Sequence, residues 1–209
     1  MQQLLLELAP PLPPTLENFS QGKNGAAVKA LRDALAGGEG FVFLWGPGGS
    51  GKTHLLRAFS AAAAAARREA VAAYDVARLG AVEQLALFDQ CNRLRASKGA
   101  LVASAEGPPA DLPLRPDLRS RLASGIVLQL HPLSDAEKAA ALTAHAAERG
   151  MALDAELIAY LLRHFDRDMG TQIAMLDALD RYSLQRQRPI TLPLLKEALR
   201  ALSEEPRRG

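Results

Sequence analysis

The sequence predicts an α/β fold, in which a parallel sheet is flanked by helices, followed by a small all-α lid domain. Three observations support this prediction. A continuous apolar run, Phe41–Trp45, leads directly into a glycine-rich loop. Strand-like and helix-like segments then alternate up to about Pro132, which is typical of a parallel sheet with helical connections. After that residue only helical patterns follow.

The composition, with 48% hydrophobic and 23% charged residues, is ordinary for a soluble globular protein. A formal net charge of +2 is too small for an electrostatic nucleic-acid binder, so we expect no direct sequence-specific DNA binding. Met1–Leu8 has no positively charged start and is interrupted by Glu7, so it is not a signal peptide. No stretch reaches the ~18 apolar residues that a membrane span needs. The only cysteine, Cys91, fits a reducing compartment, and we expect a cytoplasmic protein.

The first domain is expected over residues 15–132, after a proline-rich spacer that ends at residue 14. Asn24–Leu35 carries apolar residues at helical spacing and ends in glycines, which predicts a helix. Phe41–Trp45 predicts a strand that is buried on both faces. The other predicted elements are the helix His54–Arg68, the strand Ala70–Tyr74, the helix Val82–Ala96 with a buried, inert Cys91, and the strand Ala100–Ser104.

Residues 133–209 are expected to form the separate helical lid. Ser134 and Glu137 make a capping box ahead of a helix over Ala139–Arg149. Thr191 and Pro193 begin the last helix. The apolar faces of the later helices are predicted at Leu157, Leu161, Leu162 and Phe165, at Ile173, Leu176 and Leu179, and at Leu195, Ala198, Leu199 and Leu202.

The segment from Gly46 to Thr53 fits the Walker A phosphate-binding pattern in full. Glycines let backbone amides converge on the phosphates, and the following helix adds its positive N-terminal end. Lys52 can neutralise the β- and γ-phosphates, and the hydroxyl of Thr53 can ligate Mg²⁺. We therefore expect ADP or ATP, with Mg²⁺, to be bound by Gly46, Pro47, Gly48, Gly49, Ser50, Gly51, Lys52 and Thr53.

A P-loop identifies a superfamily and no function. The layout of a short N-terminal helix, a P-loop core and an all-helical lid resembles the AAA+ ATPases. Within them the chain is most similar to the DnaA family, and to its short Hda-type regulators, which inactivate the replication initiator DnaA. The resemblance lies in Leu16–Phe19 with Gly22 and Asn24, Phe88–Leu94, Leu101–Ser104 with Glu106, Pro108 and Pro109, Pro116–Leu122 with Gly125, and His131–Asp135.

The resemblance implies a role for several residues. Arg121 would be an arginine finger that acts on the nucleotide of a neighbouring subunit, which implies either DnaA or a second copy in a homo-oligomer as partner. The alternative is a surface arginine beside Arg119. Ser104 would be the sensor 1 residue that orients water near the γ-phosphate, unless it is a plain strand-terminal serine. The residues implied at the nucleotide besides the P-loop are Asn18, Phe19, His54 and Arg167. The four histidines show no metal-ligand spacing.

The N-terminal segment Gln3–Leu8 looks like the Q-L-x-L-x-L peptide that docks bacterial replication proteins onto the DNA sliding clamp. The amide of Gln3 would hydrogen-bond in one pocket, and the leucines would insert into an apolar cleft. The residues implied in clamp binding are Gln3, Leu4, Leu6 and Leu8. The alternative is an apolar tail that packs on its own domain.

The sequence departs from the family in two places. Thr53 and Asp75 lie too close in the sequence to hold a second strand, a helix and the full Walker B strand. Asp75 matches the second Walker B acid, which polarises water, and Tyr74 stands where the Mg²⁺-ligating acid belongs. Either the core is reduced, or a stretch is missing between Tyr74 and Asp75. We favour a missing stretch, because losing a central strand would leave a hole in the sheet. In the lid, Gly170 stands where the nucleotide-sensing arginine is expected, and the alternative is that nearby Arg167 takes over this role.

We expect an Hda-type regulator that binds ADP and the sliding clamp and presents Arg121 to ATP-bound DnaA, with slow or absent ATPase activity of its own. One alternative is a DnaA-like initiator or helicase loader that hydrolyses ATP at replication origins. An initiator should continue into a helix-turn-helix domain, whereas this chain stops at Gly209. Another alternative is a small-molecule P-loop kinase, which would need an arginine-rich acceptor lid.

Overall fold

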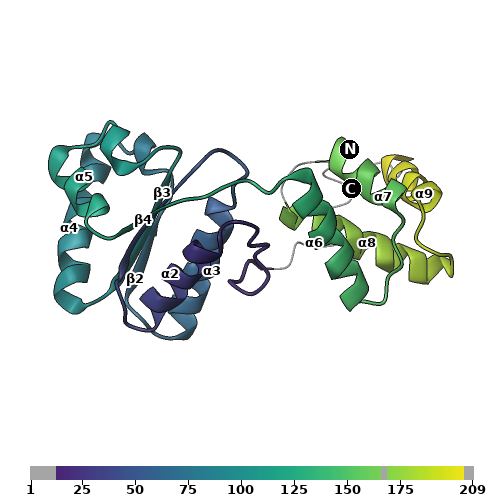
Figure 1. Cartoon of the computed structure of the whole chain (residues 1–209), viewed down its shortest axis with the longest axis horizontal. Coiled ribbons are helices and arrows are strands. Elements are labelled where there is room, and N and C mark those ends of the chain that lie inside the picture. Colours follow the sequence, from purple (N-terminus) through teal and green to yellow (C-terminus); the bar gives the residue numbers. More distant parts are fainter. Residues whose placement is uncertain (1–12, 166–168, 205–209) are drawn as a thin grey trace. The chain divides into compact units, whose positions relative to one another are not determined.

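The computed structural model describes residues 13–165 and 169–204, which fall into two compact units. The first unit spans Pro13–Pro132 and is α/β (Figure 1). The second begins at Leu133 and contains only helices among its described residues. The predicted fold class, a P-loop core with a parallel sheet and an all-α lid, is confirmed.

Helices and strands alternate along the first unit, as expected for parallel strands joined by crossover helices. They are α2 (Gly25–Leu35), β1 (Phe41–Trp45), α3 (Lys52–Ala65), β2 (Ala70–Ala73), α4 (Ala81–Ser97), β3 (Ala100–Ala105), α5 (Pro116–Ala123) and β4 (Ile126–Gln129), with short 3-10 turns at Val76–Arg78 and Pro109–Asp111. The sequence pattern does not predict β4, because this strand is only 4 residues long and its side chains alternate between half-buried and exposed.

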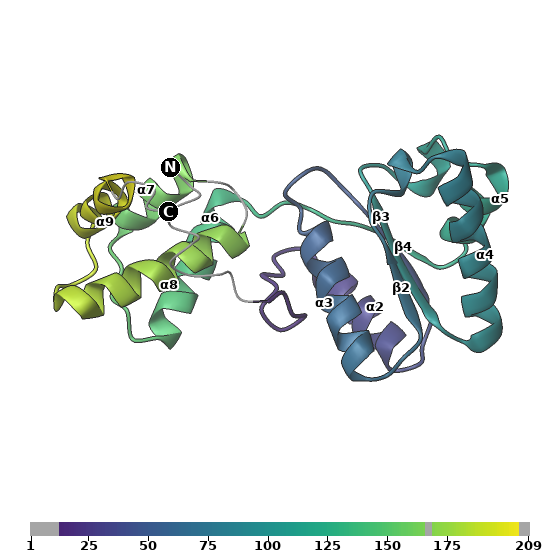
Figure 2. The ribbon, with the colours of Figure 1, turned by 180° about the vertical axis from the view of Figure 1, so that it is seen from behind.

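The strands form one sheet in the order β2-β3-β1-β4, and every neighbouring pair is parallel. Helices α2 and α3 cover one face of this sheet, and α4 and α5 cover the other (Figures 1 and 2). The side chains of β1 alternate accordingly. Val42 and Leu44 join the core under α2 and α3, whereas Phe41 and Phe43 join the core under α4 and α5. A strand covered on both faces needs no polar positions, which explains the continuous apolar run.

The stretch leading to Asp75 corrects a prediction. Strand β2 pairs directly with β3, with Ala73 opposite Ala103, so the sheet has no hole beside the P-loop strand. The chain passes from β2 through Tyr74 into Asp75, whose φ of 44° turns it sharply into the following 3-10 turn. The hole that led us to favour a missing stretch is therefore absent, and the reduced core is the alternative that the structure builds. A short strand fills the place beside β3 because its small side chains pack against both helical layers.

The second unit consists of α6 (Asp135–Glu148), α7 (Ala155–His164), α8 (Met169–Arg186) and α9 (Leu192–Glu204). Its core gathers the predicted apolar faces, including Leu157, Leu161, Leu176, Leu179 and Leu195. The predicted capping box is confirmed, because the Oγ of Ser134 accepts from the N–H of Glu137 at 3.2 Å and the carboxylate of Glu137 accepts from the N–H of Ser134 at 2.8 Å.

A polar cluster of His145, Asp177 and the more exposed Arg149 ties α6 to α8. The Nε2 of His145 lies 2.8 Å from the Oδ1 of Asp177, and the Nη1 of Arg149 lies 3.0 Å from the same oxygen. Among the described residues, no helix is long and apolar enough to cross a membrane.

Candidate nucleotide-binding site

The P-loop joins the end of β1 to the start of α3, and two of its glycines are required by close contacts. A Cβ on Gly46 would lie 2.3 Å from the carbonyl oxygen of Leu130. A Cβ on Gly51 would lie 2.5 Å from the ring of Phe19, and its φ of 92° is left-handed. By contrast, a Cβ on Gly48 or Gly49 would meet no atom of the described residues within 4 Å. The loop is therefore tightly packed at Gly46 and Gly51 and open at Gly48 and Gly49.

The side chain of Lys52 is held over the P-loop by hydrogen bonds to backbone carbonyls of the loop. Its Nζ donates to the carbonyl oxygens of Gly46 at 2.6 Å and Pro47 at 2.8 Å. Burial lowers the pKa of Lys52, while the nearby carboxylates of Glu106 and Asp75 act in the opposite direction. The ammonium group thus lies where a phosphate could replace two carbonyl partners, and two acidic groups are close enough to affect it.

Asp75 and Ser104 come together beside the loop. Ser104 lies near the end of β3, opposite Leu44 of β1, and its Oγ accepts a 3.3 Å hydrogen bond from the N–H of Asp75. The carboxylate of Asp75 pairs with the Nε of Arg78 at 2.7 Å. Ser104 is buried, and its hydroxyl accepts its hydrogen bond from the turn after β2. This arrangement places a polar group and a carboxylate at the carboxyl ends of adjacent strands, where α/β proteins bind ligands.

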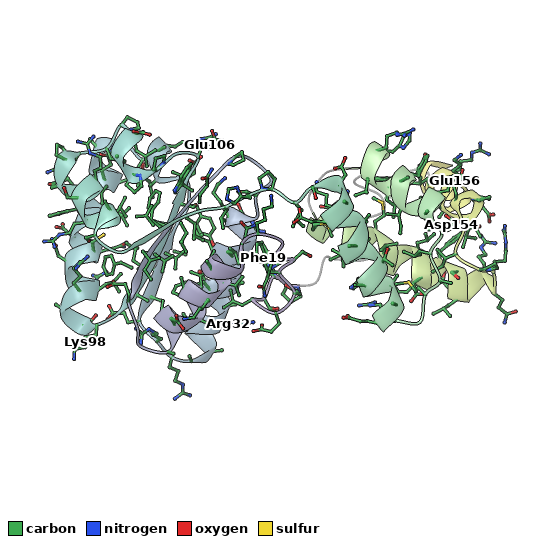
Figure 3. All side chains as sticks on the ribbon, in the orientation of Figure 1. Phe19, Arg32, Lys98, Glu106, Asp154 and Glu156 are labelled. Carbon is green, nitrogen blue, oxygen red and sulfur yellow. The ribbon has the colours of Figure 1, made fainter. Side chains whose placement is uncertain are left out.

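The segment of residues 15–24, which we call the framing segment, lies against the P-loop. The ring of Phe19 is 8% exposed, contacts Gly51, and lies 5.3 Å from the ring of His54 (Figure 3). His54 also meets the carbonyl oxygen of Thr15 through Nε2 at 2.9 Å. The side chain of Asn18 accepts from the N–H of Thr15 at 2.8 Å and donates to the carbonyl of Pro13 at 3.1 Å. These residues therefore build and fix the wall beside the loop.

Thr53 is exposed at the second position of α3, so its hydroxyl is accessible to a metal ion bound with phosphates. Tyr74, in the place of a metal-ligating acid, is 45% exposed and has no group that binds Mg²⁺ well. In the part of the chain that the structure describes, no cluster of three or more histidine, cysteine or acidic residues could hold a metal ion by itself. The site thus fits Mg²⁺ only together with the phosphate oxygens of a nucleotide.

Arg121 is not gathered with these residues. It lies in the last turn of α5, and its guanidinium is 5.8 Å from the centre of the Phe88 ring on α4. Its half-buried side chain belongs to the α4–α5 layer, whereas the P-loop leads into α3 on the opposite layer. Arg121 is thus placed apart from the chain's own P-loop lysine.

Five of the predicted site residues, Gln3, Leu4, Leu6, Leu8 and Arg167, lie outside the described residues. Glu106 is not among the predicted site residues, although its carboxylate opposes the lowering of the Lys52 pKa by burial. A signal is present in the sequence, since Glu106 directly follows the end of β3, the strand beside β1. The carboxyl ends of parallel neighbours meet at one edge.

Comparison with known proteins agrees with this fold. A family model described as "Hda, lid domain" matches residues 135–199. An uncharacterized protein of Haemophilus influenzae is 37% identical over 214 residues, with 88% of this chain and 93% of that protein covered.

Two solved structures are similar in fold. Domain III of the replication initiation protein DnaA from Thermotoga maritima matches with a TM-score of 0.68 and 19% identity, covering 93% of this chain and 99% of that one. AMPPCP-bound DnaA from Aquifex aeolicus matches with a TM-score of 0.65 and 20% identity, covering 91% of this chain and 72% of that one.

Proposed function

This chain belongs to the Hda/DnaA family of AAA+ proteins, and from that premise we propose that it is an Hda-type regulator of DNA replication initiation. In this proposal it binds ADP at the P-loop and docks on the DNA sliding clamp through Gln3–Leu8. It then presents Arg121 to ATP-bound DnaA and stimulates hydrolysis there.

The position of Arg121 is the observation that carries the proposal. An arginine finger serves a nucleotide on another subunit, so it should be accessible and independent of its own P-loop. Arg121 is partly exposed on α5, and its described contacts are with the α4–α5 layer. Its guanidinium forms no ion pair with an acid among the described residues, so the charge can be offered to a partner.

The P-loop supports the nucleotide part of the proposal. The open side at Gly48 and Gly49, together with the ammonium of Lys52, suits a diphosphate. Tyr74 and Gly170 stand where the family has a metal-ligating acid and a nucleotide-sensing arginine. A site without the metal-ligating acid supports binding of ADP better than turnover of ATP.

The alternative is a DnaA-like or helicase-loader-type ATPase that acts at replication origins. The position of Asp75 near both Ser104 and Lys52 favours it, because a carboxylate and a buried hydroxyl beside the P-loop could orient an attacking water. The two functions differ in where ATP is hydrolysed, by this chain or by its partner.

Capture of purified sliding clamp tests the proposal most directly. The full chain should retain the clamp, and Leu6→Ala should weaken retention. Leu5→Ala is the matched control, because Leu5 occupies a variable position of the Q-L-x-L-x-L pattern and should have little effect. Equal loss with both variants would indicate general apolar binding and contradict docking by the motif. The companion assay follows DnaA ATP hydrolysis with clamp on DNA, and hydrolysis that this chain performs alone would favour the alternative.

A further inference from the structure

Asn24 is an N-terminal cap of α2 that does not use its side chain for capping. An asparagine at this position ordinarily accepts a hydrogen bond from an N–H of the first helical turn. Asn24 makes no such bond. Its Oδ1 instead accepts from the N–H of His131 at 2.8 Å, and its Nδ2 donates to the carbonyl oxygen of His131 at 2.8 Å. This amide is 3% exposed, and it bridges residues that are far apart in the sequence.

The segment that Asn24 holds also touches the P-loop. Leu130 directly follows β4, and its N–H donates to the carbonyl of Trp45 at 2.6 Å. Its own carbonyl oxygen occupies the space beside Gly46, where a Cβ would lie at 2.3 Å. Leu130 and His131 are therefore held between the first glycine of the P-loop and the amide of Asn24. The first unit ends directly afterwards, at Pro132.

Gly46 is also hydrogen-bonded to Lys52, the residue that would bind the phosphates of a nucleotide. The carbonyl oxygen of Gly46 accepts from the Nζ of Lys52 at 2.6 Å. Phosphate oxygens compete for this ammonium, because a charge-assisted bond is stronger than a bond to a neutral carbonyl. A nucleotide would thus change the hydrogen bonding of Gly46, whose backbone packs against Leu130. A continuous series of contacts therefore links Lys52 to Asn24, through Gly46, Leu130 and His131.

We propose that Asn24 is a positioning residue that holds Leu130 and His131 against Gly46, so that nucleotide binding at the P-loop is transmitted to the segment leading into the lid. The proposal rests on the nucleotide site of the proposed function and deepens it. A residue that served only the stability of α2 would keep its side chain at the cap. The side chain of Asn24 instead uses both its donor and its acceptor on His131.

Amide hydrogen exchange of the full chain, with and without ADP, tests this inference. In the wild-type chain, ADP should slow exchange both at Gly46–Thr53 and at Leu130, His131, Leu133 and Ser134. In Asn24→Ser, which keeps a capping hydroxyl but is too short to reach His131, ADP should slow exchange only at the loop. The Kd for ADP should rise by about three- to tenfold, because Gly46 is no longer held in its binding conformation by Leu130.

Asp154→Ala is the matched control, because it removes the cap of α7, where Asp154 accepts from the N–H of Leu157 at 2.6 Å. It should lower the melting temperature and leave the ADP response of Leu130 and His131 unchanged. Asn24→Asp keeps the acceptor for the N–H of His131 and loses the donor, so an intermediate response is expected, and it replaces Asn24→Ser if that variant does not fold.

Three results would overturn the inference. ADP-dependent protection of Leu130 and His131 that persists in Asn24→Ser, or in Asn24→Asp at full strength, contradicts the role of Asn24. Protection of the wild-type loop without protection of Leu130 and His131 contradicts the coupling. Absence of any ADP response in the wild-type loop removes the proposed nucleotide site itself, and this outcome separates failure of the function from failure of the coupling.

Discussion

The N–H of Asp75 donates a hydrogen bond of 3.3 Å to the Oγ of Ser104, which joins the turn after β2 to the neighbouring strand β3. Asp75 has a φ of 44°, a left-handed conformation that costs free energy for a residue with a side chain. The contact with Ser104 helps to hold this conformation. It places Asp75, which matches the second acid of the Walker B pattern, at the carboxyl ends of the strands, where the P-loop also lies.

Replacement of Ser104 by alanine should therefore destabilise the first unit. A buried hydrogen bond contributes about 0.5–1.5 kcal/mol net, so the free energy of unfolding should fall by about 1 kcal/mol in denaturant titrations. Ser120→Ala is the control, because the Oγ of Ser120 donates to the carbonyl of Pro116 on an exposed helix surface and should matter less. Equal losses in the two variants would mean that the bond to Asp75 is not important for stability.

Lys52→Ala should abolish nucleotide binding, because the Nζ of Lys52 is the cation held directly over the P-loop carbonyls. Calorimetry with ADP is the measurement. Arg57→Ala, which removes an exposed cation from the same helix, is the control for the change in net charge and should bind normally. If Lys52→Ala binds ADP within about tenfold of the wild-type chain, roughly 1.4 kcal/mol, the P-loop assignment is wrong.

The chain should bind ADP more tightly than ATP, because Tyr74 cannot help hold Mg²⁺ at the γ-phosphate. Tyr74→Asp should raise the Mg²⁺-dependent affinity for ATP, and it should fold, since Tyr74 is 45% exposed at the end of an edge strand. Tyr74→Asn keeps a size similar to that of aspartate without its charge and serves as the control. Tighter binding of ATP by the wild-type chain, with brisk turnover, would favour the initiator-type ATPase.

Arg121→Ala should leave the melting temperature and the ADP affinity nearly unchanged, because Arg121 contacts Phe88 rather than the P-loop. It should greatly slow ATP hydrolysis in DnaA, since arginine fingers contribute about 10³–10⁵ in rate. Arg119→Ala on the same helix is the matched control and should stimulate DnaA normally.

Deletion of Gln3–Leu8 should reduce the same activity by a different route, through failed recruitment to the clamp. Raising the protein concentration should partly restore the deletion variant, because tethering only raises effective concentration. It should not restore Arg121→Ala, whose missing charge no concentration supplies. A similar response of both variants to concentration would make Arg121 an ordinary binding residue.

Cys91 should resist thiol reagents in the folded chain. It is fully buried, and burial raises its pKa to about 11, so hardly any thiolate forms near pH 8. Because the folded pKa lies above the unfolded value of 9.0, this thiol favours the folded state below pH 9. That contribution is lost as pH rises toward about 11. Rapid labelling at pH 8 without denaturant, followed by mass spectrometry, would show that the α4–α5 layer opens readily.

Local patterns in the sequence determined the P-loop, the two-sided burial of Phe41–Trp45 and the capping box at Ser134 and Glu137. Each depends on residues that are close in the chain, where spacing alone sets which backbone groups and faces meet. Strand β4 could not be predicted in this way, because its four residues carry too little periodicity.

Only the tertiary structure decided how the reduced core closes, which acids approach Lys52 and what Asn24 does. The pairing of β2 with β3 depends on which strand fits between two helical layers, and no local pattern ranks those choices. The carboxylate of Glu106 affects the pKa of Lys52 because β3 and β1 are neighbours in the sheet. Asn24 stands at a helix N-terminus, where its side chain would ordinarily cap the helix. It binds His131 instead, because the backbone N–H and carbonyl of His131 satisfy both polar groups of the buried amide.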